Sequence, residues 1–284
     1  MLEIAKQVRA AFSLLNPEQV RKRALRPVSL GLVASTNRGY EELEEFLVPA
    51  SLPEGLRDQL RSTIHRAGDP QVPPQVDLVL YEPGLHCPEG GFRFYPDDPA
   101  ETVREILHEN DDLALALARR YPAFRKPVVD RTILAVAEEN TLFAVATALP
   151  NVVPSLFELP WAFGEFASDT VFLTLNQIRM AFLIAAACGS NVGFTEQKGE
   201  ILSIVAAAFG WRTVARELAG KIPLGGGLIP KGAIAFAGTF VVGKGLERFH
   251  HGNLPYTRRE REEVYQAAFE RGKETAESLT SKAD

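Results

Sequence analysis

Two prolines and three consecutive glycines interrupt an otherwise helical stretch between residues 210 and 249. Proline lacks a backbone N–H and glycine weakens a helix, so one unbroken helix cannot pass through residues 222–230. The apolar patterns of residues 211–221 and 231–250 therefore predict two helices joined by a turn. This helical hairpin constrains the second half of the chain more than any other feature. Its breaking residues are Pro223, Gly225, Gly226, Gly227 and Pro230.

The second arm of the predicted hairpin carries a ridge of small residues. Ala235, Thr239 and Gly243 are four residues apart, so they lie on one face of a helix. A neighbouring helix can approach such a face closely, because little side-chain volume separates the two backbones. Ridges of this kind occur in membrane bundles and in tight soluble bundles, so the ridge predicts helix–helix contact in either setting.

The chain changes character near residue 112. Before it, short apolar runs bounded by turn residues predict strands at residues 28–34, 76–80 and 92–95, and the patterns between them predict helices at residues 41–47, 56–67 and 97–107. After it only helical patterns occur, at residues 112–120, 128–147, 161–189, 195–209, 211–221, 231–250 and 258–276. The predicted fold class is α+β and mostly α. A small N-terminal α/β domain covers residues 1–111, and an all-helical bundle covers residues 112–284.

The first predicted strand, its loop and the next helix have the order of a phosphate-binding loop. The template Gly-x-x-x-x-Gly-Lys-Ser/Thr places Ala34 at the first glycine, Gly39 at the second, Tyr40 at the lysine and Glu41 at the metal-binding hydroxyl. Three of these four positions carry the wrong residue. Gly39 is thus the one weak candidate for a nucleotide contact.

Charge argues further against a nucleotide. With the helix beginning at Glu41, a carboxylate would stand at the helix N-terminus, where phosphate should bind. Tyr81 replaces the aspartate of an Asp-x-x-Gly metal loop, and no Asn-Lys-x-Asp guanine motif occurs. The sequence therefore predicts a nucleotide-free domain without a cofactor. Two origins stay open: a G-domain that has lost its nucleotide, or an α/β layer with a chance likeness to one.

No constellation of residues indicates an enzyme or a metal site. Nucleophile elbows, Cys/His dyads and dinucleotide glycine motifs are missing, and His86 with Cys87 lacks the second pair that zinc requires. Glu165, Asp169 and Asn176 share a face of the predicted helix 161–189, but metal-binding bundles use Glu-x-x-His, and residues 112–249 contain no histidine. We expect this face to be solvent-exposed or paired with basic residues of 211–221.

Composition bears on partners and location. The formal net charge of -5 gives no basic field for nucleic acid, and two distant cysteines indicate a reducing compartment. The N-terminus has no secretory signal pattern, and the apolar run 180–189 is about half a membrane span. We expect a cytoplasmic protein. Basic residues at positions 21–26 either complement a helix dipole or contact anionic lipid at the cytoplasmic membrane face.

Three motifs in the helical half carry a family resemblance. They are Gly-Trp-Arg at 210–212, the Ile-Pro pairs that bound residues 222–230, and Ala-Gly-Thr at 237–239. With these, about residues 127–273 resemble the bacterial YcjF-like domain of unknown function. That domain is often fused behind, or encoded with, Era-like GTPases, and its members are mostly membrane-associated or GTPase-linked. The resemblance implies no catalytic residues, and it implies a degenerate Era-like G-domain, a pseudo-GTPase, in front of the helical domain.

These observations lead to one functional hypothesis and two alternatives. The chain is expected to be a non-enzymatic scaffold whose hairpin binds a protein partner, such as a GTPase, or the cytoplasmic face of the inner membrane. One alternative is a nucleotide-dependent switch in which Gly39 and the amides of residues 37–40 still hold phosphate. The other is a small-molecule pocket inside the bundle. The expected interaction residues are Trp211, Arg212, Pro223, Gly225, Gly226, Gly227, Pro230 and Lys231.

Overall fold

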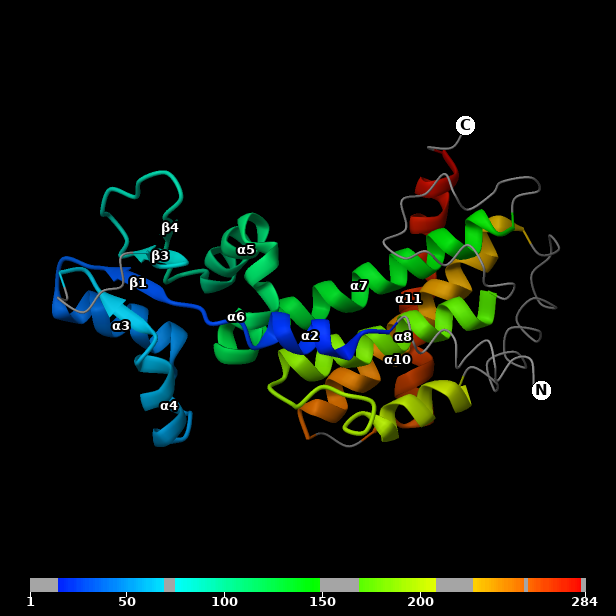
Figure 1. Cartoon of the computed structure of the whole chain (residues 1–284). Helices are drawn as coiled ribbons and strands as arrows, with labels where there is room; N and C mark the ends of the chain where they lie inside the picture. The colour runs from blue at the N-terminus through cyan, green and yellow to red at the C-terminus, as the bar shows by residue number, and fades with distance from the viewer. Residues whose placement is uncertain (1–14, 69–74, 149–168, 208–226, 253–254, 282–284) are drawn as a thin grey trace. The chain divides into compact units, whose positions relative to one another are not determined.

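A computed structural model describes residues 15–68, 75–148, 169–207, 227–252 and 255–281 (Figure 1). These residues form an α+β, mostly helical fold with one small parallel sheet, as predicted. The chain divides into two units. The sheet unit contains the described parts of residues 19–129 and 186–190, and the helical unit contains the described parts of 1–18, 130–185 and 191–284. The predicted domain boundary at residue 112 stays a prediction.

The sheet has four parallel strands in the order β2-β1-β3-β4. Alternate residues of β1 and β3, Leu30 with Leu32 and Leu78 with Leu80, are buried. This period-two burial is why the short apolar runs become strands. The three predicted strands are confirmed, each in shorter form. The strands are β1 (Leu30–Val33), β2 (Ile64–Arg66), β3 (Leu78–Tyr81) and β4 (Phe92–Arg93).

Strand β2 was not predicted. The sequence pattern indicated one helix over residues 56–67, but α4 (Glu54–Arg61) ends early and Ile64 begins the strand. Residues 64–66 pair in register with β1, and the hydrogen bonds of this pairing stabilise a strand more than continuing α4 would stabilise a helix. His65 is therefore a half-buried residue of a strand.

Helices around the sheet supply the rest of the core of this unit. Leu43 and Leu47 of α3 and Ile106 of α5 are buried, and the rings of Phe46 and Phe94 lie 5.0 Å apart. Apolar side chains at helical spacing explain this burial. The helices of this unit are α2 (Pro17–Ala24), α3 (Asn37–Leu47), α4, α5 (Pro99–Glu109) and α6 (Ala114–Arg120), with a 3₁₀ turn at Asp111–Leu113.

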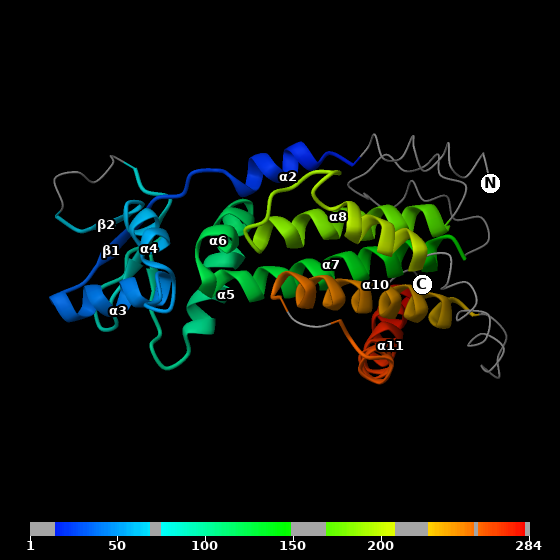
Figure 2. The same cartoon turned by 90° about the horizontal axis from the view of Figure 1, so that it is seen from below.

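In the helical unit, α7 (Pro122–Ala146), α8 (Asp169–Ala187) and α10 (Leu228–His250) run alongside one another, and α11 (Arg258–Ser281) crosses them (Figures 1 and 2). Helix α7 continues through Pro127, whereas the sequence predicted a start at residue 128. Buried Phe124 and Val128 on either side of the proline compensate for the lost backbone bond. Residues 198–207 are also helical.

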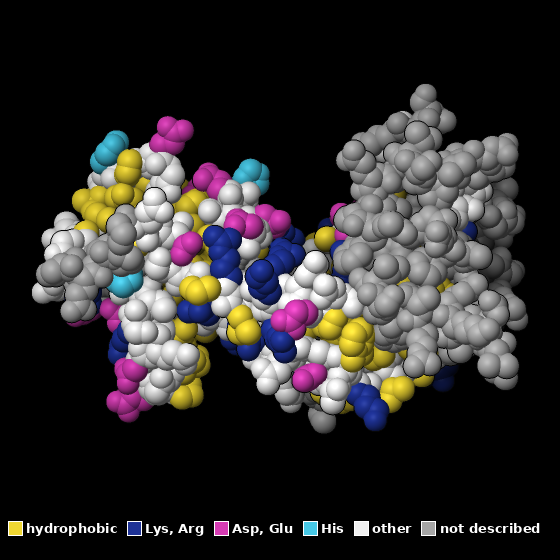
Figure 3. Space-filling model, viewed as in Figure 1, with side chains coloured by type: hydrophobic (Ala, Val, Ile, Leu, Met, Phe, Trp, Pro, Cys, Tyr) yellow, Lys and Arg dark blue, Asp and Glu magenta, His cyan; other side chains and the backbone are white. Residues whose placement is uncertain are grey.

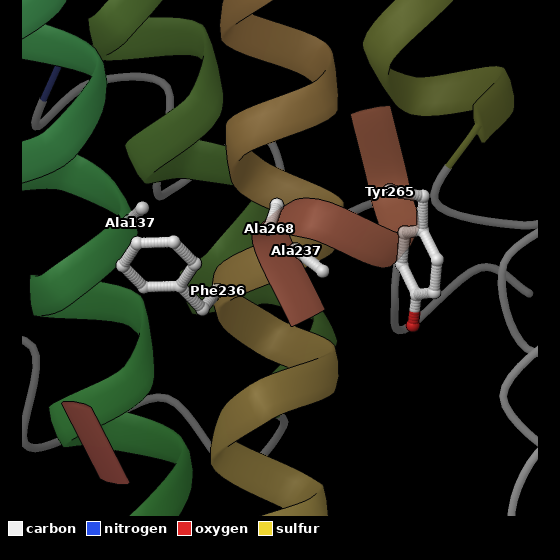
Figure 4. Packing of buried hydrophobic residues seen from close by; sticks show 5 residues of the cluster. All are labelled: Ala137, Phe236, Ala237, Tyr265 and Ala268. Atoms are coloured by element: carbon white, nitrogen blue, oxygen red, sulfur yellow. The ribbon is translucent and has the colours of Figure 1, made fainter. Parts of the chain in front are cut away.

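Helix α10 lies at the centre of this packing. Phe236 and Ala237 are buried together with Ala137 of α7 and with Tyr265 and Ala268 of α11. Figure 4 shows the ring of Phe236 facing Ala137. Residues from three helices thus share one apolar cluster, and α10 is a core helix on more than one side.

The predicted small-residue ridge makes the closest helix contacts. A methyl group added at Gly243 would lie 2.7 Å from Ile133 of α7 and 3.1 Å from the sulfur of Met180 of α8. On α11, a methyl group at Gly272 would lie 3.0 Å from the backbone of Ala233 of α10. The ridge therefore packs inside the bundle, as its small side chains allow.

One described helix is long and apolar enough to cross a membrane. The window Thr170–Ala187 of α8 has a mean hydropathy of 1.5, and 72% of it is buried within the structure. This window is longer than the apolar run at 180–189 indicated by the sequence. Because most of it is covered by protein, its apolar character is accounted for by the core of the bundle.

Gly243→Ala should destabilise the protein by about 1–3 kcal/mol, because the new methyl group overlaps Ile133. The matched control is Gly245→Ala in the same helix, where a methyl group meets no atom within 4 Å among the described residues. That control should raise the free energy of unfolding by about 0.5–1 kcal/mol. Chemical denaturation measures both. Equal effects of the two changes would show that α10 does not make this close contact.

Candidate functional site

The loop between β1 and α3 is the place where the sequence suggested a phosphate site. Helix α3 begins at Asn37 because the Thr36 hydroxyl caps it, accepting a hydrogen bond from the Gly39 amide at 3.0 Å. The helix thus starts four residues earlier than predicted. Glu41 lies in its second turn, exposed to solvent, and does not stand at the N-terminus.

A different carboxylate occupies that N-terminus. Strand β3 pairs with β1 so that Tyr81 lies opposite Val33, and Glu82 follows directly. Its Oε2 accepts hydrogen bonds from the backbone amide of Ser35 at 2.6 Å and from the Ser35 hydroxyl at 2.7 Å. A methyl group at Gly39 would lie only 2.3 Å from Oε1. Glu82 therefore fills the space above the first turn of α3, where a phosphate-binding loop would hold its anion.

The electrostatics favour the ionised form of this carboxylate. The amide and hydroxyl of Ser35 hold the pKa of Glu82 below its ordinary value, because both donors bind the charged form. The N-terminal end of α3 adds a favourable partial positive charge. The anion at the N-terminus of α3 is therefore the carboxylate of Glu82, which follows the neighbouring strand β3.

The sequence analysis considered Tyr81 but did not predict a role for Glu82, the next residue. The order of the elements could have indicated it, because neighbouring parallel strands end at the same edge of a sheet, and Glu82 and Ser35 each follow such a strand. The lysine position of the template holds Tyr40, whose ring lies 5.1 Å from the guanidinium carbon of Arg66. Gly39, the weak nucleotide candidate, uses its amide to bind the Thr36 cap.

Glu82→Gln should lower stability at neutral pH, because the amide replaces a charged acceptor of two hydrogen bonds. A carboxyl group with a depressed pKa stabilises the fold above its unfolded pKa, and this contribution disappears as pH falls below about 4. The difference between wild type and variant should therefore shrink in acid. Unfolding midpoints between neutral and acidic pH measure it.

Glu89→Gln is the matched control for this titration. Glu89 is exposed in the same β3–β4 connection and has no hydrogen bond or ion pair to a described residue. Its difference from wild type should be small and independent of pH. A Glu82→Gln difference that stays constant with pH would contradict the placement of the carboxylate on Ser35.

The predicted hairpin site is only partly described. Trp211, Arg212, Pro223, Gly225 and Gly226 lie outside the described residues. The second arm begins at Leu228, earlier than the predicted residue 231, with exposed Gly227 as its N-cap and Pro230 in its first turn. Lys231 donates from Nζ to the hydroxyl of Thr147 at 3.1 Å. The start of α10 is thereby joined to the end of α7.

A buried polar layer crosses the middle of the helical unit. The amide of Asn140 on α7 donates to the hydroxyl of Thr239 on α10 at 2.7 Å, and Gln177 on α8 donates to the same hydroxyl at 3.3 Å. Asn176 donates to the Asn140 carbonyl oxygen at 2.9 Å and to Glu139 at 3.1 Å. Polar groups paired in this way fix which residues of three helices lie side by side.

This layer corrects the prediction for the polar face of the helix at 161–189. Asn176 is 3% exposed and binds Asn140 of α7, so it does not face solvent. Glu165 and the proposed basic partners lie outside the described residues. Among the described residues no group of three or more His, Cys, Asp or Glu could hold a metal ion.

Comparison with known proteins finds no matching family model, no matching curated protein and no matching solved structure. The relation to the YcjF-like domain therefore stays a prediction drawn from the hairpin motifs.

Proposed function

We propose that this chain is a non-enzymatic interaction scaffold. Its sheet unit holds no nucleotide, and its helical unit binds the cytoplasmic face of the inner membrane or a protein partner, with a GTPase as the first candidate. The observation that carries the nucleotide-free part of the proposal is the carboxylate of Glu82 on Ser35 at the N-terminus of α3.

The position of Glu82 weighs against the nucleotide-switch alternative. A bound phosphate would have to displace a carboxylate that already has two hydrogen bonds, or lie beside it at the cost of repulsion between like charges. The Gly39 amide is engaged by Thr36, and no lysine stands at position 40 to offset the phosphate charge.

The packing of the helical unit indicates where a partner would bind. The small-residue ridge of α10 is buried against α7 and α8, so it is not a free surface. Gly227, in contrast, is exposed at the start of α10, next to the hairpin turn. The resemblance to a membrane-associated, GTPase-linked family supports a membrane or a GTPase as the partner of the hairpin.

Calorimetric titration tests the nucleotide-free part of the proposal. Wild-type protein in Mg²⁺ should give no heat of binding with GTP, GDP or ATP, because the anion position is filled and the lysine is missing. Micromolar binding of any of these nucleotides to the wild-type chain would refute the scaffold proposal in favour of the switch.

Flotation with vesicles tests the association. The wild-type protein should float with vesicles containing anionic phospholipid, and flotation that survives high salt would indicate apolar insertion. Gly227→Asp should reduce flotation several-fold while stabilising α10, because aspartate is a better N-cap and the site has room for a side chain. Loss of binding without loss of stability would assign the contact to this end of α10.

Gly55→Asp is the control for that variant. Gly55 lies in the first turn of α4 in the sheet unit, with no atom within 4 Å of an added methyl group among the described residues. It introduces the same charge at another helix N-terminus and should leave flotation unchanged. If the wild type floats with neither neutral nor anionic vesicles, the membrane drops out of the proposal and the protein partner remains.

A further inference from the structure

The outer side of α3 borders a shallow hollow of about 510 Å³ in the sheet unit. Its apolar floor comes from Phe46, Phe94 and two prolines before and at the start of α5, Pro96 and Pro99. The ring of Phe46 is half-buried and packs on Phe94, so the floor is part of the core and does not need a partner to form.

The rim of the hollow is acidic. Glu41, Glu42 and Glu45 of α3 line it beside a single basic residue, Arg38. Arg38 pairs with Glu42 at 3.0 Å, and Glu45 accepts a hydrogen bond from the Ala50 amide at 2.9 Å. The side chain of Glu41 has no hydrogen bond or ion pair to a described residue. Exposed Asp97 and Asp98 lie next to the two floor prolines in the chain. An apolar floor with an acidic rim suits a basic segment that carries one apolar side chain.

The same unit presents such a segment elsewhere. Residues 21–25 read Arg-Lys-Arg-Ala-Leu; Lys22 and Arg23 are exposed, and the side chain of Leu25 is among the few large apolar ones on the surface, at 53% exposed. Figure 3 shows Lys and Arg side chains gathered in the middle of the view, in the region that Figure 1 labels α2 and α6. The segment therefore offers positive charge beside an apolar anchor.

The segment cannot reach the hollow of its own chain. Arg26 fastens its end through ion pairs to Asp77, just before β3, and to Asp112. The hollow borders α3 and lies beyond the carboxyl end of β4, whereas Asp77 lies at the amino end of β3, and parallel strands place these two ends at opposite edges of the sheet. A contact between the two surfaces must therefore join two molecules.

We propose that the hollow binds residues 21–25 of a second copy of this chain, with Leu25 on the floor and the basic side chains against the rim. Because the two surfaces differ, the contact is heterologous and head-to-tail. A contact of this size is small, so the association is weak and depends on salt. The proposal concerns the sheet unit and does not rest on the proposed membrane or GTPase contact of the helical unit.

Sedimentation of the full-length protein at several hundred micromolar tests this. The wild type should associate at low salt and dissociate at high salt. Two variants should each raise the dissociation constant about tenfold or more: Glu41→Lys with Glu45→Lys in the hollow, and Lys22→Gln with Arg23→Gln in the segment. The changed side chains are exposed, so both variants should keep the wild-type circular dichroism. The segment variant should keep the wild-type unfolding midpoint, whereas the hollow variant should unfold slightly earlier, because Glu45 Oε1 accepts a hydrogen bond from the Ala50 amide at 2.9 Å.

Mixing the two variants is the decisive step. The hollow variant keeps an intact segment and the segment variant keeps an intact hollow, so a mixture should form one-to-one dimers that cannot extend. Glu89→Lys with Glu109→Lys, an equal charge change at exposed positions of the sheet unit, should associate like the wild type. A wild type that stays monomeric, variants that still associate, or a mixture that stays monomeric would each overturn the proposal.

Discussion

The parallel pairing of β1 with β3 is the contact on which the chemistry of the sheet unit depends. It brings the end of β3 beside the loop after β1, and so places the carboxylate of Glu82 on the Ser35 amide and hydroxyl. A helix N-terminus that elsewhere would attract phosphate is neutralised here by a side chain of the same fold. The loop between β1 and α3 follows the strand–loop–helix order of a phosphate site, and the negative charge at its helix N-terminus is supplied by Glu82.

The helical unit depends on a different constraint, the close approach of helix backbones. Gly243 and Gly272 remove the side chains that would keep α10 from its neighbours, and the contacts are too tight for a methyl group. The polar layer around Thr239 then fixes how three helices align, since any shift would leave buried amides without partners. Residues that resemble a membrane-helix interface thus serve packing within one chain.

Together these features separate the two halves by role. The sheet unit contributes surfaces of opposite charge, the hollow beside α3 and the segment at residues 21–25. The helical unit contributes a bundle with an apolar core, in which Gly227 is exposed at the N-terminus of α10.

The sequence by itself determined the elements with strong local signals. Short apolar runs bounded by turn residues predicted β1 and β3, and small residues four apart predicted the ridge. Helical periodicity predicted the second arm from residue 231, three residues after its start at Leu228. Tertiary structure decided the rest. Strand β2 exists because β1 offers a partner, and α7 continues through Pro127 because its neighbours are buried. Glu82 and Asn176 acquired their roles from residues distant in the chain, and no local pattern encodes such distances.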